Sequence, residues 1–202
     1  MSAKIVVVGA GGHAKVVIST LQAAGYSVVA VFDDDLAKVG TEILGIPVAG
    51  PLDAIADGDY EFGVVAVGQN RVRKAITERV GLNWLSTVHP SAVIHPSVKL
   101  GAGVTVFAGA IIQPDTSIGD HAIINTAATV DHDCSIGDFA HIAPGAHLAG
   151  GVQVGEGTLL GIGSVVAPYL SVGAWTTVGA GGAVVRDLPD GVTALGIPAR
   201  PK

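Results

Sequence analysis

The chain contains 202 residues, of which 49% are apolar and 14% charged, and its formal net charge is −6. A negative charge without a clustered basic face excludes the electrostatic footprint of a nucleic-acid-binding protein. The single cysteine, Cys134, rules out an internal disulfide and fits a reducing cytosol.

Residues 1–85 alternate between strand and helix patterns and are expected to form a small α/β domain. We predict strands over residues 4–8, 27–32 and 62–67 and helices over residues 13–24, 51–56 and 71–80. Glycines separate the first strand from the first helix. The pattern amounts to about half of a doubly wound fold, and therefore predicts a half-Rossmann-like domain.

The turn after the first strand satisfies the G-x-G-x-x-G/A fingerprint at Gly9, Gly11 and Ala14. Such glycines let a phosphate approach the amides at a helix N-terminus, where the helix dipole favours negative charge. A dinucleotide enzyme normally has two halves of this kind, whereas only one fits before residue 86. A mononucleotide-sized site is therefore favoured. A turn that needs glycine only for packing and an NAD-dependent oxidoreductase are the alternatives.

Polar residues near this turn are the candidates for contacts with the substrate. Asp33 and Asp34 follow the second strand about twenty residues after the glycines, in the position of an acid that binds ribose. With Asn70 they could equally contact uracil, guanine or ribose, so the nucleobase stays open. The predicted substrate-binding residues are Gly11, Gly12, His13, Asp33, Asp34 and Asn70.

From Thr87 to about Leu188 the sequence divides into consecutive six-residue units with no insertion. The second place of the unit is aliphatic at all 17 positions from Val88 to Val184, and the sixth holds small residues such as Cys134. Two inward places in six are typical of a parallel β-helix, in which three units close a coil and residues 18 apart stack. Residues 86–202 are therefore predicted to form five to six coils with a C-terminal tail, with Cys134 in the core.

Residues 157–185 carry no charge, and their number alone would permit a membrane span. They contain seven glycines and Pro168 and keep the six-residue period, so they are assigned to the β-helix. The N-terminus has a short apolar run that ends in glycines, without the h-region and cleavage site of a signal peptide. We therefore expect a cytoplasmic protein that does not bind membranes.

Four stretches of the sequence resemble one enzyme family: GAGGHAKVV at 9–17, VGQNRVRK at 67–74, INTAATVDHDCSIGDFAHIAPGA at 124–146, and the closing LGIPAR. Over nearly its whole length the chain resembles the hexapeptide-repeat acetyltransferases of nucleotide-sugar pathways. These act on UDP-linked 4-amino sugars or GDP-perosamine and are related to sialic-acid O-acetyltransferases. The resemblance implies a left-handed β-helix, a homotrimer, acetyl-CoA between neighbouring β-helices, and a nucleotide sugar on the N-terminal domain.

The catalytic residues are expected in the family's DH[DE] motif, matched by Asp131, His132 and Asp133. The resemblance makes His132 the general base, and a histidine suits proton removal from an attacking amine because it titrates near neutrality. Gly150, 18 residues on, is expected to leave room above it for a ligand. By resemblance Asp133 orients the ring, with Asp131 as second candidate, and His141 donates to the thioester oxygen.

For the acetyl-CoA site, the resemblance points to main-chain groups at the fourth place of three units. These residues are Gly150, Ile162 and Ala180. Arg186 and Arg200 could meet the phosphates of CoA, although exposed arginines are often only solvated. The closing segment resembles the tail that lies near adenosine in the family.

Together, the residues and the resemblance predict an acetyl-CoA-dependent N-acetyltransferase. Its acceptor is the amine, at C4, of a nucleotide-linked sugar, and this amine attacks the thioester directly. A sugar O-acetyltransferase and a non-catalytic, nucleotide-binding trimeric scaffold are the alternatives. No metal is expected, because a zinc site needs converging ligands and His141 and His147 cannot converge within one chain. They are one unit apart and therefore turned about 120° around the prism. A site formed by ligands from two subunits stays open. A thiol nucleophile at Cys134 is disfavoured by burial.

Overall fold

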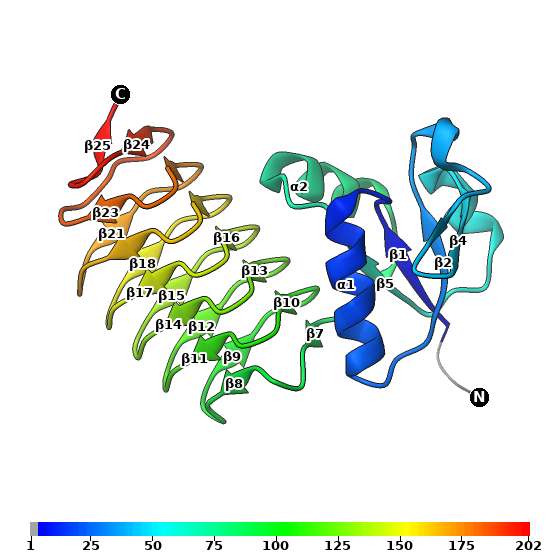
Figure 1. The fold of residues 1–202 in the computed structure, drawn as a ribbon, viewed down its shortest axis with the longest axis horizontal. Helices are drawn as coiled ribbons and strands as arrows, with labels where there is room; N and C mark the ends of the chain where they lie inside the picture. Colours follow the sequence, from blue (N-terminus) through cyan, green and yellow to red (C-terminus); the bar gives the residue numbers. More distant parts are fainter. Residues whose placement is uncertain (1–3) are drawn as a thin grey trace.

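The N-terminal region is one twisted sheet with helices on both faces (Figure 1). The computed structural model describes residues 4–202. The strands are β1 (Ile5–Val8), β2 (Val28–Phe32), β3 (Glu42–Ile43), β4 (Ile46–Gly50), β5 (Phe62–Val65) and β6 (Asn83–Trp84). The helices are α1 (Gly12–Ala23), the 3₁₀ helices η1 (Leu36–Lys38) and η2 (Leu52–Asp57), and α2 (Asn70–Arg79). In the order β3-β4-β2-β1-β5-β6 all neighbours are parallel except β3 and β4, which confirms the half-Rossmann-like prediction.

Two features of this region differ from the sequence prediction. The predicted helix over 51–56 is the 3₁₀ helix η2, and the β3–β4 hairpin was not predicted at all. The hairpin turns at Leu44 and Gly45, both with positive φ, at 50° and 77°. A turn of this kind usually carries Asn or Gly at its first position, so a leucine there gives no signal. The two-residue strands β3 and β6 are likewise too short to show a period.

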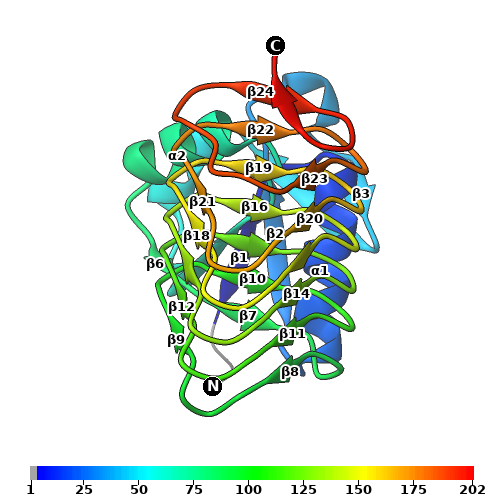
Figure 2. The same ribbon diagram turned by 90° about the vertical axis from the view of Figure 1, so that its left-hand side faces the viewer.

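Residues 87–184 form the predicted parallel β-helix of 17 two-residue strands, β7–β23, arranged on three faces. The first face, here the docked face, contains β7 (Thr87–Val88), β10 (Thr105–Val106), β13 (Ile123–Ile124), β16 (His141–Ile142), β19 (Leu159–Leu160) and β22 (Thr177–Val178). The second, the apolar face, contains β8 (Val93–Ile94), β11 (Ile111–Ile112), β14 (Thr129–Val130), β17 (His147–Leu148), β20 (Val165–Val166) and β23 (Ala183–Val184). The third, the polar face, contains β9 (Lys99–Leu100), β12 (Ser117–Ile118), β15 (Ser135–Ile136), β18 (Gln153–Val154) and β21 (Ser171–Val172). The tail adds β24 (Thr193–Leu195) and β25 (Arg200–Pro201) to the docked face (Figure 2).

Strands 18 residues apart pair in register, as Thr105 does with Thr87 and Ile123, so the stacking predicted from the period is confirmed. The aliphatic second places and small sixth places form one continuous core, and Cys134 lies in it with 2% exposure. Residues 157–185 belong to the upper coils. Among the described residues no helix combines the length and apolar character that a membrane crossing requires.

The corners of the prism turn at the fifth place of each unit. From Gly103 to Gly181 every fifth place has positive φ, and half of them carry side chains instead of glycine. The non-glycine positions are Asp115, His121, Ala127, Asp133, Phe139, Tyr169 and Trp175. Because this left-handed region is costly for residues other than glycine, the stacked coils must hold it in place.

The N-terminal region packs against the docked face, and we call this contact the seam (Figure 1). Phe107 and Ile123 of the β-helix share a buried core with α1 and β1. Lys74 of α2 pairs with Glu156 at 2.6 Å across the seam. β6 ends at Trp84, near the predicted boundary at residue 85, and an independently folding domain 1–85 stays a prediction.

Candidate active site

His132 lies on an exposed turn between β14 and β15, where the apolar face meets the polar face. Its side chain is 48% exposed, and its Nδ1 lies 2.7 Å from Oδ2 of Asp133. A carboxylate only accepts hydrogen bonds, so in the neutral ring Nδ1 carries the hydrogen. Nε2 is then unprotonated and can act as a base. We call this turn the His132 corner.

Asp133 is the partner of the imidazole ring, whereas Asp131 holds the main chain. Oδ1 of Asp131 accepts the backbone N–H of His132 at 2.8 Å. The hydrogen bond to Asp133 is the main cause that raises the pKa of His132 above its usual value, and the charge of Asp131 adds a smaller effect. The corner therefore combines a base with a carboxylate that stabilises its protonated form.

Gly150 lies one coil above His132, as predicted, but the space above it is not empty. A Cβ at Gly150 would lie 2.5 Å from Cε1 and 2.6 Å from Nε2 of His132. The expectation that glycine leaves room for a ligand is therefore corrected: the imidazole itself fills that space. Glycine at this position lets the ring lie against the main chain, with Nε2 beside residue 150.

His141 occupies a different environment, on the docked face under the N-terminal region. Its Nδ1 lies 3.2 Å from the carbonyl oxygen of Gly68, so Nδ1 donates. Its Nε2 lies 2.9 Å from Nδ2 of Asn125, whose Oδ1 already accepts the N–H of Thr126, so Nε2 accepts. Both contacts require the neutral ring. The expected donation from His141 to a thioester oxygen is not available in this conformation, because its one N–H is already engaged.

The seam holds two histidines in the neutral state. Burial, with a contribution from the charge of Arg73, lowers the pKa of His13 to about 4 and the pKa of His141 to about 4. The two rings are 6.2 Å apart, and Nε2 of His13 is buried without a hydrogen-bond partner among the described residues. Within residues 4–202 no three His, Cys, Asp or Glu side chains gather closely enough to hold a metal ion.

The glycine turn contains one structural glycine and two that face open space. Gly9 has φ +109°, and a Cβ there would lie 2.8 Å from Val67, so packing requires glycine. Gly11 and Gly12 have ordinary φ, and a Cβ at either would meet nothing within 4 Å. The amides at the start of α1 have no side-chain cap. The open turn therefore suits the approach of a phosphate, and packing does not explain Gly11 and Gly12.

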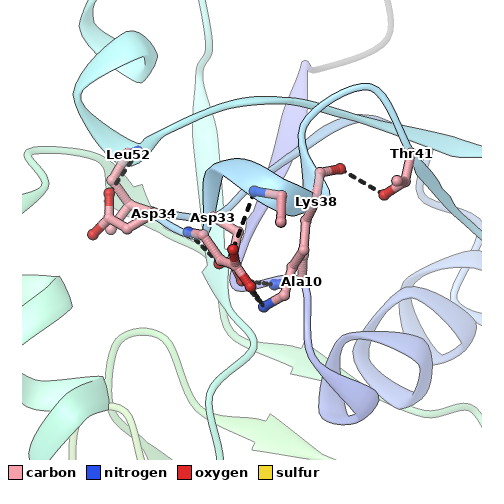
Figure 3. Close-up of polar contacts among 8 residues, drawn as sticks. Ala10, Asp33, Asp34, Lys38, Thr41 and Leu52 are labelled. Atoms are coloured by element: carbon pink, nitrogen blue, oxygen red, sulfur yellow. Dashed lines mark hydrogen bonds and ion pairs between the residues drawn. The ribbon is translucent and has the colours of Figure 1, made fainter.

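Asp33 and Asp34 lie beside the glycine turn at the carboxyl end of β2 (Figure 3). Asp33 accepts the N–H of Ala10 at 2.6 Å and pairs with Lys38 at 3.1 Å, so it braces the turn. Asp34 pairs with Arg79 at 2.7 Å. Hydrogen bonds that favour the charged forms lower the pKa of both carboxyl groups. The structure thus brings both acids to the predicted place, although each already has a cationic partner.

Asn70 begins α2 and lies in the seam, away from the glycine turn. Its Nδ2 donates to the carbonyl of Gly157 at 2.9 Å, and its Oδ1 is buried with no partner among the described residues. It lines a cleft of about 210 Å³ together with Leu159 and Trp175. Asn70 therefore faces the β-helix as well as the loop that follows β5.

The residues predicted for the acetyl-CoA site flank the apolar face. Gly150 is at the His132 corner, whereas Ile162 and Ala180 are exposed at the opposite edge of that face, so one chain does not bring all three together. In the described part of the chain none of the three main-chain N–H groups donates a hydrogen bond. Each is free to donate to a ligand. Arg186 and Arg200 are exposed.

Two residues that hold this arrangement were not singled out from the sequence, Asn125 and Arg73. Asn125 orients the ring of His141, and Arg73 is the buried cation of the seam. Asn125 occupies the third place of its unit, where polar residues are common. Arg73 lies in a helix with three other basic residues, so its burial gives no sequence signal.

Solved structures with the same architecture include a GDP-perosamine N-acetyl transferase and the acetyltransferase domain of PglB. The chain is 48% identical to PerB from Caulobacter crescentus in complex with CoA and GDP-perosamine, with a TM-score of 0.93 over 99% of this chain and 97% of that chain. It is 40% identical to the acetyltransferase domain of PglB from Neisseria gonorrhoeae in complex with acetyl coenzyme A, with a TM-score of 0.94 and full coverage of both. The chain belongs to this family of left-handed β-helix sugar N-acetyltransferases.

The N-terminal region carries its own family signature, since residues 4–80 match the PglD N-terminal domain. Among curated relatives, the family member UDP-N-acetylbacillosamine N-acetyltransferase from Bacillus subtilis is 42% identical over 113 residues, half of each chain. An uncharacterised protein from Acanthamoeba polyphaga mimivirus is 34% identical over 104 residues, which span 21% of its length. The aligned segments thus cover half or less of the curated relatives.

Proposed function

We propose that the protein transfers the acetyl group of acetyl-CoA to the amine, at C4, of a nucleotide-linked amino sugar. The family relatives with bound CoA, acetyl-CoA and GDP-perosamine support this class of donor and acceptor. The observation that carries the proposal is the His132 corner, where a carboxylate holds Nδ1–H and leaves Nε2 as a base. The reaction requires such a base, because the attacking amine must lose a proton.

The residues of the corner have separate tasks in this proposal. Acetyl-CoA supplies the acetyl group as a thioester. Nε2 of His132 accepts the proton of the amine while the new C–N bond forms, and Asp133 stabilises the imidazolium. The same Nε2–H then returns the proton to the sulfur as the C–S bond breaks. The N–H of Gly150 donates no hydrogen bond among the described residues, and we assign to it the donation to the thioester oxygen.

We assign the nucleotide to the N-terminal region. The open glycines at Gly11 and Gly12 offer main-chain amides for a phosphate, and Asp33, Asp34 and His13 surround them. This assignment is supported by the match of residues 4–80 to the PglD N-terminal domain. The nucleotide could carry any base with which these acids can pair.

We further propose that the active site is completed by a second copy of the chain in a homotrimer. The N-terminal region covers the docked face, whereas His132 projects from the corner opposite that face. An acceptor bound to the N-terminal region therefore cannot reach the His132 of its own chain. The apolar face offers a contact surface, since Val93 is 62% and Val165 43% exposed. Light scattering should give three times the chain mass of 20.1 kDa. We place the enzyme in the cytoplasm, where Cys134 stays reduced.

The proposal is tested by thiol release from acetyl-CoA with UDP-, GDP- and dTDP-linked 4-amino sugars and with sialic acid. His132→Ala should lower kcat by about 10²–10⁴-fold with any amine acceptor, because it removes the base. His89→Ala, at a histidine of the first coil that follows β7 on the docked face, is the matched control and should keep full activity. If sialic acid alone were acetylated, the acceptor would be a hydroxyl group and not an amine, and the protein would be an O-acetyltransferase. No thiol release with any acceptor would overturn the enzyme assignment.

A further inference from the structure

Arg73 is a buried cation whose partners are all carbonyl groups. Its side chain is 1% exposed, and no carboxylate pairs with it among the described residues. It makes five hydrogen bonds, at 2.6–3.5 Å, to carbonyl oxygens in two parts of the molecule. The acceptors are Val67 and Gly68 in the loop after β5, and His121, Phe139 and Ala140 in the β-helix.

This arrangement needs the guanidinium group. Arginine has five N–H donors in a rigid plane, which is the number of contacts found here, whereas lysine has three donors on one atom. A cation buried without a carboxylate is unfavourable unless its donors are all used. The loop at residues 66–70, which follows the carboxyl end of β5, is thereby held against the docked face.

The same loop positions His141. The carbonyl of Gly68 accepts from Arg73 at 3.2 Å and from Nδ1 of His141 at 3.2 Å. Arg73 thus fixes the acceptor that selects the neutral Nδ1–H form of the ring. His13, which follows the glycine turn, lies 6.2 Å from His141, and a Cβ at Gly68 would lie 3.8 Å from the ring of His141 and 4.0 Å from that of His13. Arg73 therefore connects the β-helix to the region proposed to bind the nucleotide sugar.

We propose that Arg73 is a positioning residue for the acceptor side of the active site, which holds the loop 66–70 and, through Gly68, the ring of His141. The catalytic part of this inference rests on the proposed function, whereas its binding part does not. Loss of these contacts lets the loop move away from the glycine turn. The affinity for the nucleotide sugar should fall, while the acetyl-CoA site on the apolar face should be unaffected.

The charged groups that face the seam are few. Arg71, Arg73 and Lys74 come from α2, with Arg71 4.4 Å from the ring of Trp175. Asp120, Asp138 and Glu156 come from the corner of the β-helix. The acids lie on the surface and interact with Lys74 and His121. The charge of Arg73 acts on His121 too, and it contributes to the lowered pKa of His13 and His141. Removal of the Arg73 charge should therefore let these two histidines bind protons at a higher pH.

The test compares Arg73→Met and Arg73→Lys with Lys74→Met. The control removes one charge from the same helix and the same seam, but at an exposed ion pair. Both Arg73 variants should raise KM for the 4-amino nucleotide sugar by about 10–100-fold, since a displacement of about 1 Å in a binding loop can have that effect. KM for acetyl-CoA should stay within about twofold, and the control should match the wild type.

Histidine NMR titrations separate positioning from simple stabilisation. His13 and His141 should not titrate above pH 5 in the wild type, should titrate at higher pH in Arg73→Met, and should stay neutral in Arg73→Lys, which keeps the charge. A lowered Tm with unchanged KM and unchanged titrations would overturn the proposal. If Arg73→Met does not fold, KM in Arg73→Lys decides the outcome. If the wild type acetylates no amino sugar, the proposed function fails. The affinity for the nucleotide and the histidine titrations, compared between wild type and the Arg73 variants, then still decide the role of Arg73.

Discussion

The His132 corner and the seam place histidines of one chain in opposite electrostatic environments. At the corner, an exposed imidazole has a carboxylate partner that raises its pKa. In the seam, burial and a nearby arginine lower the pKa of His13 and His141 to about 4. The same side chain is therefore a base in one place and a fixed, neutral hydrogen-bonding group in the other. Environment, and not residue type, decides which histidine can exchange protons.

A single methyl group added at the corner should have a large effect on catalysis. Gly150→Ala places a Cβ within 2.6 Å of Nε2, so the imidazole must swing away. We expect kcat to fall by about 10²-fold, because a base displaced by about 1 Å no longer meets the amine. Tm should hardly change, since the clashing atoms belong to a flexible, exposed side chain. Enzyme assays and thermal unfolding of the same preparation check both parts.

Gly81→Ala is the matched control for this substitution. A Cβ at Gly81 meets nothing within 4 Å and its φ is ordinary, so activity and Tm should both be kept. If Gly150→Ala retained full kcat, the ring position seen against residue 150 would be irrelevant to the reaction. A large fall in Tm would instead mean that Gly150 serves the packing of the coils.

The seam predicts acid sensitivity of the fold. His13 and His141 in the seam have a folded pKa of about 4, below the unfolded value of about 6.5, so the unfolded state binds more protons between these values. Stability is therefore full above pH 6.5 and declines as pH falls toward 4. Urea unfolding at pH 7.5 and pH 5, at one protein concentration, should show a loss of about 2–4 kcal/mol.

Replacement of both seam histidines separates this effect from general acid denaturation. His13→Asn with His141→Asn should flatten the dependence on pH between 7.5 and 5, even if the variant is less stable at neutral pH. His95→Ala, at an exposed histidine of the first coil, is the control for the loss of a histidine outside the seam. An unchanged slope in the double variant would show that the acid sensitivity arises elsewhere.

The β-helix was predictable because the sequence repeats. In each six-residue unit the second and sixth places carry the residues that point inward. The period gave the strands, the stacking at 18 residues and the burial of Cys134. It did not give the positive φ of Phe139 or Trp175, because the bulky residues there carry no turn signal. In the N-terminal region, periodicity located α1 and α2, but Leu44 concealed the hairpin.

The site was predictable only where its geometry is local. His132 and Asp133 are adjacent in sequence, so the motif alone brings them together. The contacts of His141 depend on how the N-terminal region packs on the docked face, and that packing joins Gly68 to His141, 73 positions away. No period or motif encodes such a contact. The engaged N–H of His141 could therefore emerge only from the structure.

The smallest expected effect is a shift in the pH dependence of kcat/KM when the carboxylate partner of His132 is removed. His132 acts as a base only when neutral, so kcat/KM should fall as pH decreases through its pKa. Asp133 raises that pKa, and Asp133→Asn should therefore move the acidic limb to lower pH. The plateau should drop by about tenfold, because the imidazolium loses its carboxylate partner.

Asp131→Asn should have the same kind of effect on the pH profile, but a smaller one. The charge of Asp131 contributes less to the raised pKa of His132 than the hydrogen bond of Asp133 does. Its acidic limb should move in the same direction by a smaller amount, and its plateau should stay near the wild-type value. Profiles in which both variants retain the wild-type limb would assign that limb to another group, such as the amine of the acceptor. A limb that moved to higher pH in Asp133→Asn would contradict the electrostatic contrast, because removal of a negative charge cannot stabilise the imidazolium.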